Sequence, residues 1–137
     1  MDAVERHVTL EADLAEVWEL LTRPDDLAGW LGAEVTLDPT PGTAGLVVDH
    51  DGTRRRLRVD EVDEGRRISW RWWVDGDDDG AASRVEITLT PADGGTRVDV
   101  VELPLPGSQA NASAGTAWSH RLLHLEALLL LAAAVRG

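Results

Sequence analysis

The amino-acid sequence predicts an α+β fold, in which a curved antiparallel sheet of about six to seven strands wraps around a long C-terminal helix. Three observations support this prediction. Short segments from Ala33 to Leu103 alternate between polar and apolar residues, and turn residues separate them. The segment Thr116–Val135 contains neither Gly nor Pro, which is typical of a long helix.

The N-terminal segments predict one strand followed by one or two short helices. Val4–Leu10 alternates as a strand does. Asp13 and Glu16 have the spacing of a helix capping box, and apolar residues then recur at helical spacing. Pro24 ends this helix, and one further helical turn ends near Trp30.

The middle of the chain predicts consecutive hairpins that form a meander. Turn signals such as Asp51–Gly52 separate the strands. The expected strands are Ala33–Leu37, Gly45–His50, Thr53–Val62, Arg66–Val74, Ser83–Pro91 and Thr96–Leu103. Such a sheet must cover its apolar face, and the C-terminal helix is the only large cover that the sequence offers.

The C-terminal helix is predicted to be apolar on two sides. One stripe would face the sheet, and it consists of Trp118, Leu122, Leu125 and Leu129. The opposite side carries Leu123, Ala127, Leu130, Leu131 and Ala134. Because an exposed apolar patch often marks an interface, we expect a homodimer or another partner on this side. The alternative is a C-terminal end that loops cover.

The composition excludes several classes of function. A length of 137 residues suits a single domain, residues 1–137, and a net charge of −12 argues against nucleic acid and anionic membranes as partners. The absence of Cys excludes disulfides and thiol chemistry. No signal sequence is visible, and Ala127–Val135 is too short for a membrane span of about 20 residues, so we expect a cytoplasmic protein. The bases are all Arg, which we interpret as the coding bias of a GC-rich, bacterial genome.

Four segments in this order resemble a known family. They are Asp13–Trp30, Arg66–Trp72, Ser83–Glu102 and Ala117–Leu129. The chain is similar to the START-like (SRPBCC, helix-grip) superfamily, in the branch of the heat-shock-chaperone ATPase activator homologues. It departs from the family pattern where Gly42–Gly45 replaces a Gly-Gly pair and Ala117 replaces a Gly. The resemblance implies a single helix-grip domain in a family that includes ligand carriers, cyclases, hydrolases and chaperone activators.

The stretch from Ile68 to Trp73 holds three of the six tryptophans of the chain. Ile68, Trp70 and Trp72 share one strand face, which the resemblance places inward, and Trp73 lies on the other. Indoles on this face either fill the core or line a ligand cavity. The predicted ligand-binding residues are Trp30, His50, Arg55, Leu57, Val59, Trp70, Trp72, Val85, Ile87, Val98, Val100, Glu102, Trp118, Leu122 and Leu125.

Polar residues that alternate with inward-facing apolar residues are the candidates for catalysis or for anchoring a ligand. His50 shares parity with Leu46 and Val48, and Glu102, Arg55 and Arg6 also alternate with apolar residues. Glu102 with His50 or an Arg could form a general acid–base pair or anchor a ligand oxygen. The alternative is that these side chains extend to solvent at the strand ends.

No metal or cofactor is expected. His120 and His124 lie four residues apart, but no third ligand is evident nearby, and we interpret them as surface histidines. The acidic loop Asp75–Gly80 lacks the glutamate of an EF-hand and is interpreted as a solvated loop.

Three functions remain open at this point. The first is the binding of a hydrophobic or aromatic small molecule in a Trp-lined cavity. The second is an enzyme that resembles polyketide cyclases or small hydrolases and uses Glu102 with His50 or an Arg. The third, implied by the resemblance alone, is an interaction protein of the chaperone-activator or stress-response type.

Overall fold

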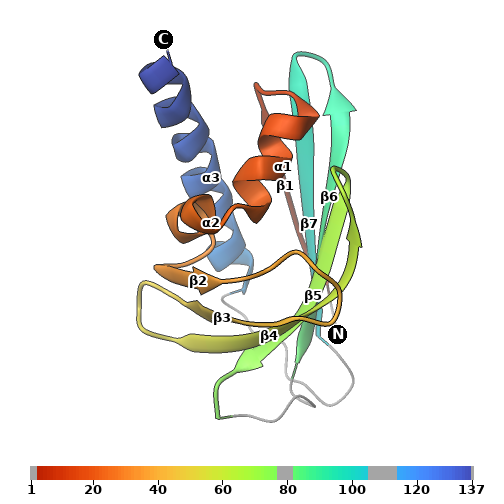
Figure 1. Ribbon diagram of the computed structural model, residues 1–137, viewed down its shortest axis with the longest axis vertical. Helices are drawn as coiled ribbons and strands as arrows, with labels where there is room; N and C mark the ends of the chain where they lie inside the picture. Colours follow the sequence, from red (N-terminus) through yellow and green to blue (C-terminus); the bar gives the residue numbers. More distant parts are fainter. Residues whose placement is uncertain (1–2, 77–81, 105–113, 137) are drawn as a thin grey trace.

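The computed structural model describes residues 3–76, 82–104 and 114–136. Within these residues, one strand and two short helices precede six further strands and a long helix (Figure 1). The elements are β1 (Val4–Leu10), α1 (Leu14–Thr22), α2 (Pro24–Trp30), β2 (Glu34–Thr36), β3 (Ala44–Val48), β4 (Arg54–Asp63), β5 (Arg67–Val74), β6 (Ser83–Ala92), β7 (Gly95–Pro104) and α3 (Ala114–Arg136). The predicted loop Asp75–Gly80 falls in part outside the described residues.

The strands form one antiparallel sheet in the order β1-β7-β6-β5-β4-β3-β2. From β2 to β7, each strand lies beside the next strand in the sequence. The first strand, β1, pairs with the last, β7. The sheet curls, and all three helices lie on its concave side, with α2 packed against both α1 and α3 (Figure 1). The predicted α+β fold, a curved antiparallel sheet around a C-terminal helix, is confirmed.

Local signals set the ends of the two short helices. The Asp13 carboxylate caps α1 by accepting a hydrogen bond of 2.9 Å from the backbone N–H of Glu16. Pro24 occupies the first turn of α2, where its missing N–H costs nothing. At the far end of α2, the buried Trp30 indole donates to the Leu20 carbonyl at 2.9 Å and fastens α2 to α1.

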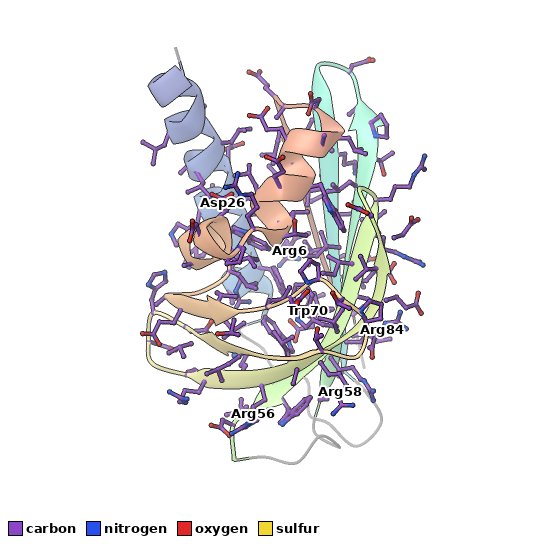
Figure 2. All side chains as sticks on the ribbon, viewed as in Figure 1. Arg6, Asp26, Arg56, Arg58, Trp70 and Arg84 are labelled. Carbon is purple, nitrogen blue, oxygen red and sulfur yellow. The ribbon has the colours of Figure 1, made fainter. Side chains whose placement is uncertain are left out.

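The concave face of the sheet and the inner face of α3 form one hydrophobic core. In Figure 2, Trp70 lies between the sheet and the helices, whereas Arg56 and Arg58 point away from it. The predicted inward residues Leu57, Val59, Ile68, Trp70, Trp72, Val85, Ile87, Val98 and Val100 are all buried, together with Trp30, Trp118, Leu122 and Leu125. Trp73 has the opposite parity, and it lines a small hollow on the outer face with Arg58, Arg71 and Ala82.

The sequence predicted that Leu46, Val48 and His50 share the inward face of β3, and this prediction is wrong. Val47 is buried and pairs with Arg55 of β4, so Leu46 and Val48 face outward. The alternation of β3 gave no clear choice because Leu46, Val47 and Val48 are all apolar. His50 therefore does not point into the sheet interior, and it lies exposed beyond the end of β3.

Gly32 allows the chain after α2 to approach β3 closely. A Cβ atom at this position would lie 2.8 Å from Cγ1 of Val47 and 2.9 Å from the backbone oxygen of Val48. This approach brings the end of α2 against the turn between β3 and β4, where the candidate site lies. No helix among the described residues is long and apolar enough to cross a membrane.

Candidate functional site

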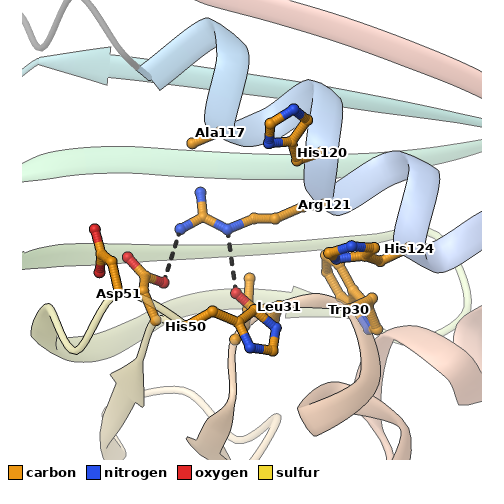
Figure 3. A pocket seen from close by; sticks show the side chains of 10 residues that line it. Trp30, Leu31, His50, Asp51, Ala117, His120, Arg121 and His124 are labelled. Carbon is orange, nitrogen blue, oxygen red and sulfur yellow. Dashed lines mark hydrogen bonds and ion pairs between the residues drawn. The ribbon is translucent and has the colours of Figure 1, made fainter.

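A pocket of about 540 Å³ opens between the end of α2, the β3–β4 turn and the first turns of α3. It is lined by Trp30, Leu31, Gly32, Asp49, His50, Asp51, Ala117, His120, Arg121 and His124. Figure 3 shows the Arg121 guanidinium between the β3–β4 turn and α3, with histidines around it. Three segments that are distant in the sequence thus supply one concave surface, which is the usual form of a small-molecule site.

The β3–β4 turn holds Asp49, His50 and Asp51 in a fixed loop. The Asp49 N–H donates to the Thr53 carbonyl at 2.8 Å, and Gly52 closes the turn with a φ of +89°. The Asp51 carboxylate accepts from the Thr53 N–H at 2.9 Å. This backbone hydrogen bond, with a further one from the Thr53 side chain, lowers the pKa of Asp51 below its ordinary value, so the carboxylate stays ionised at the pocket mouth.

Arg121 forms the inner wall of the pocket. Its side chain is 9% exposed, and its Nη2 donates to Oδ1 of Asp49 at 3.1 Å. Its Nε donates to the Leu31 carbonyl at 3.1 Å. Burial lowers the pKa of Arg121, Asp49 opposes that effect, and an arginine remains charged in any case. Oδ2 of Asp49 also accepts a hydrogen bond from Arg55 at 3.1 Å, so one carboxylate binds two guanidinium groups.

Behind Arg121 lies a layer of tryptophans. Trp72 and Trp118 are stacked with ring centroids 5.7 Å apart, and Trp70 and Trp72 meet edge to face with centroids 5.8 Å apart. The Arg121 guanidinium carbon lies 4.8 Å from the Trp118 ring centroid and 5.0 Å from that of Trp72. These distances are within the range of cation–π attraction, so the indoles help to hold the buried charge.

The Glu102 carboxylate bonds two of these tryptophans. Its Oε1 accepts from the Trp118 indole at 2.6 Å, and its Oε2 accepts from the Trp72 indole at 3.1 Å. The Glu102 carboxylate therefore turns inward, as predicted, and satisfies two indole N–H groups that would otherwise be unpaired. The Trp70 indole nitrogen, by contrast, is buried without a hydrogen-bond partner among the described residues.

The structure divides the predicted site residues into two sets. Trp30 and His50 line the pocket, and Arg55 reaches Asp49 from β4. The other predicted residues lie in the packed core, apart from the half-buried Glu102. Sequence reasoning missed Asp49 and Arg121. A lone Arg within the apolar stripe of the C-terminal helix, one position before Leu122, was the signal that could have revealed the second.

The histidines of α3 are exposed, as the sequence predicted, but they border the pocket. His124 meets His50 edge to face, with ring centroids 6.0 Å apart. Among the described residues, no group of three or more His, Asp or Glu side chains has the geometry to hold a metal ion. The imidazoles can thus offer flat surfaces and hydrogen bonds to a ligand.

The curved sheet that encloses a C-terminal helix, with a pocket at one end of that helix, defines a helix-grip protein. The chain belongs to the family described as activator of Hsp90 ATPase homolog 1-like protein, whose profile matches residues 11–130. This match confirms the resemblance that the sequence motifs indicated. No curated protein matches the chain.

Several solved structures share the fold. DynU16, a protein in the dynemicin biosynthetic locus, is 27% identical with a TM-score of 0.82 over 94% of this chain. This chain spans 47% of the DynU16 chain, about half its length. CalU16 from Micromonospora echinospora is 20% identical with a TM-score of 0.76, over 93% of this chain and 75% of its own. The Aha1 dimer from Colwellia psychrerythraea is 16% identical with a TM-score of 0.79, over 94% of this chain and 96% of its own.

Proposed function

We propose that the protein binds a small, largely apolar molecule in the pocket between α2, the β3–β4 turn and α3. The observation that carries the proposal is the pocket itself, whose volume of about 540 Å³ lies within the usual range for ligand sites. Trp30, Leu31 and Ala117 offer apolar contacts, and Arg121 offers one fixed charge. The relative DynU16 belongs to a biosynthetic locus, which favours a small molecule as ligand.

The tryptophan layer has a supporting role in this proposal. Trp72 and Trp118 are at most 3% exposed, so they hold Arg121 from behind. The ligand would occupy the open space in front of Arg121. On this proposal the ligand lies beside the first turns of α3, whereas the sequence-based prediction put it in a Trp-lined cavity between the sheet and that helix.

A catalytic role for Glu102 with His50 has less support. Both Glu102 oxygens accept indole hydrogen bonds. Among the described residues, neither His50 nor any Arg forms a hydrogen bond or ion pair with Glu102. A general acid–base pair needs direct contact or one bridging water, so the binding function is the stronger proposal.

The proposal is tested with 8-anilino-1-naphthalenesulfonate as a probe. We expect saturable binding at one site per chain, seen as a rise of probe fluorescence and as shifts of the backbone amide signals of residues 30–32, 49–51 and 117–124. The variant Ala117→Phe would fill the pocket from α3, and we expect it to weaken binding at least tenfold. Ala15→Phe, at an exposed position of α1, is the matched control and should bind as the unchanged chain does.

Binding that is equally strong in Ala117→Phe would show that the probe sits elsewhere. Far-ultraviolet circular dichroism of both variants would establish that the fold is intact. An absence of any saturable binding, by this probe and by the naphthalene series described below, would contradict the proposed function.

We further propose that a second copy of the chain covers the outer side of α3. Leu123, Leu130 and Leu131 are 60%, 65% and 64% exposed there, beside the exposed Ala127. Large apolar residues so close together on one helix are unfavourable in water and suit a symmetric dimer contact. The similar Aha1 protein from Colwellia psychrerythraea is a dimer, which favours a second copy over another partner.

Sedimentation velocity tests this contact. We expect a dimer for the unchanged chain and a monomer for Leu130→Glu, because a charge in the centre of the patch would be buried without a partner. Leu103→Glu, at an exposed position of β7, is the matched control and should remain a dimer. A chain that is monomeric at 100 μM without any substitution would refute the proposal.

A further inference from the structure

We infer that the pocket selects a flat aromatic molecule with a hydrogen-bond-accepting oxygen, and that Nη1 of Arg121 is the donor that recognises this oxygen. The inference rests on the proposed function and specifies the chemistry of its ligand. It follows from an account of which polar groups around the pocket are already bonded and which are available.

The acceptors deep in the pocket each accept a hydrogen bond from a charged guanidinium group already. Oδ1 of Asp49 accepts from Arg121, and Oδ2 of Asp49 accepts from Arg55. The Leu31 carbonyl accepts from Nε of Arg121. Asp51 already accepts from Thr53, and it lies at the exposed mouth. A ligand with only donor groups would therefore find few partners in the inner pocket.

The donors of the inner pocket are not all used. Arg121 donates through Nε and Nη2, and no described residue accepts a hydrogen bond from its Nη1. Figure 3 shows this nitrogen pointing away from both bonded partners. His50, His120 and His124 also line the pocket, but a neutral imidazole carries one N–H donor and one acceptor nitrogen and so suits either kind of ligand. The unbonded Nη1 of Arg121 is thus the group that favours a ligand with an acceptor oxygen.

The position of Arg121 makes its donor specific. Hydrogen bonds to Asp49 and to the Leu31 carbonyl orient the guanidinium group, and it also contacts the two stacked indoles. A donor that is already oriented loses little entropy when it binds, and a bond from a charged donor is about twice as strong as a neutral one. The imidazole rings of His50 and His124 meet edge to face and provide flat walls, which favour a planar aromatic body.

Four probes of similar size test the inference. They are 1-naphthoate, 1-acetonaphthone, 1-methylnaphthalene and 1-naphthylmethylammonium, and their Kd values are measured by titration of the backbone amide signals. We expect the two acceptor probes to bind about tenfold more tightly than 1-methylnaphthalene, because a hydrogen bond to a charged group has about that effect. A comparison of naphthoate with acetonaphthone then separates a carboxylate from a neutral carbonyl ligand.

Two outcomes separate this inference from the proposed function. If 1-methylnaphthalene or the ammonium probe binds in the pocket as tightly as the acceptor probes, the inference is overturned and the proposed function stands. If neither these four probes nor 8-anilino-1-naphthalenesulfonate shifts the pocket signals, both fail.

The variant Arg121→Lys assigns the preference to the guanidinium group. Lysine retains a positive charge opposite Asp49 but lacks a nitrogen equivalent to Nη1. We therefore expect the tenfold ratio of the Kd values of methylnaphthalene and naphthoate to fall to about threefold or less. Arg97→Lys, on the outer face of β7, is the matched control and should keep the ratio. In the unchanged chain, the Nε–H signal of Arg121 should move with naphthoate and stay in place with methylnaphthalene. An unmoved signal with naphthoate would overturn the inference without any substitution.

Discussion

The carboxylate of Glu102 is predicted to stabilise the protein by accepting hydrogen bonds from two buried indoles at once. The substitution Glu102→Gln tests this with almost no change of shape. Glutamine offers one acceptor oxygen, and its amide nitrogen would face the N–H of either Trp118 or Trp72. One indole therefore loses its partner and meets a second donor, although packing against both rings is retained.

The expected cost follows from these contacts. A hydrogen bond to a charged group contributes about 1.5–3 kcal/mol, and a buried donor without a partner costs about 1–3 kcal/mol. Because the two effects overlap for one indole, we expect Glu102→Gln to lower the free energy of unfolding by about 2–4 kcal/mol. Urea unfolding followed by tryptophan fluorescence measures it. Glu5→Gln, at an exposed position of β1, should change stability by less than about 0.5 kcal/mol.

A double-mutant cycle with Trp118→Phe gives the sharper result. In a chain that lacks the Trp118 indole, the glutamine oxygen can accept the one remaining indole hydrogen bond, from Trp72. In that chain Glu102→Gln should therefore lower the free energy of unfolding by at least about 1 kcal/mol less than it does in the unchanged chain. If Glu102→Gln is as mild as Glu5→Gln, or if the two substitutions at Glu102 and Trp118 are additive, the reasoning is refuted.

Three further predictions concern the surroundings of the pocket and the charge network. Asp49→Asn should lower stability by about 3 kcal/mol, because it leaves the buried Arg121 without its carboxylate, whereas Asp38→Asn in an exposed loop should be nearly neutral in the same urea assay. Gly32→Ala should lower the thermal midpoint and shift the amide signals of the β3–β4 turn, because its Cβ would lie 2.8 Å from Val47; unchanged signals would contradict the close approach. The hydrogen bond from Arg56 lowers the pKa of Asp75 below its ordinary 3.8, so its stabilisation is complete above that pH and is lost as the pH falls through the lower folded value. Asp75→Asn should therefore flatten the loss of stability on the acid side, and equal slopes in both chains would count against the pair.

The sequence predicted the fold well where local patterns were unambiguous. Four short-range signals each predicted an element that the structure contains. They are the helix cap at Asp13, the helix end at Pro24, the hairpin turn at Asp51–Gly52 and the alternation of Val85, Ile87 and Leu89. The prediction failed in β3 because three consecutive apolar residues fit either face of a sheet. Only the register with β4 decided that Val47 faces inward.

The candidate site depended on the tertiary structure to a greater extent. The sequence by itself determined that a tryptophan-rich strand and a C-terminal helix would meet, and the family resemblance put Trp70 and Trp72 on the inward face of that strand. The stacking of Trp72 on Trp118 was found only in the folded chain. Only the folded chain decided that Glu102 pairs with two of these indoles and that Arg121 bonds Asp49, 72 residues away in the sequence. The physical reason is that a buried charge is stable only beside partners that satisfy it. The partners of Arg121 come from the β3–β4 turn and the end of α2, and those of Glu102 come from β5 and α3. Periodicity shows which face a side chain occupies, but it does not show which polar group lies opposite.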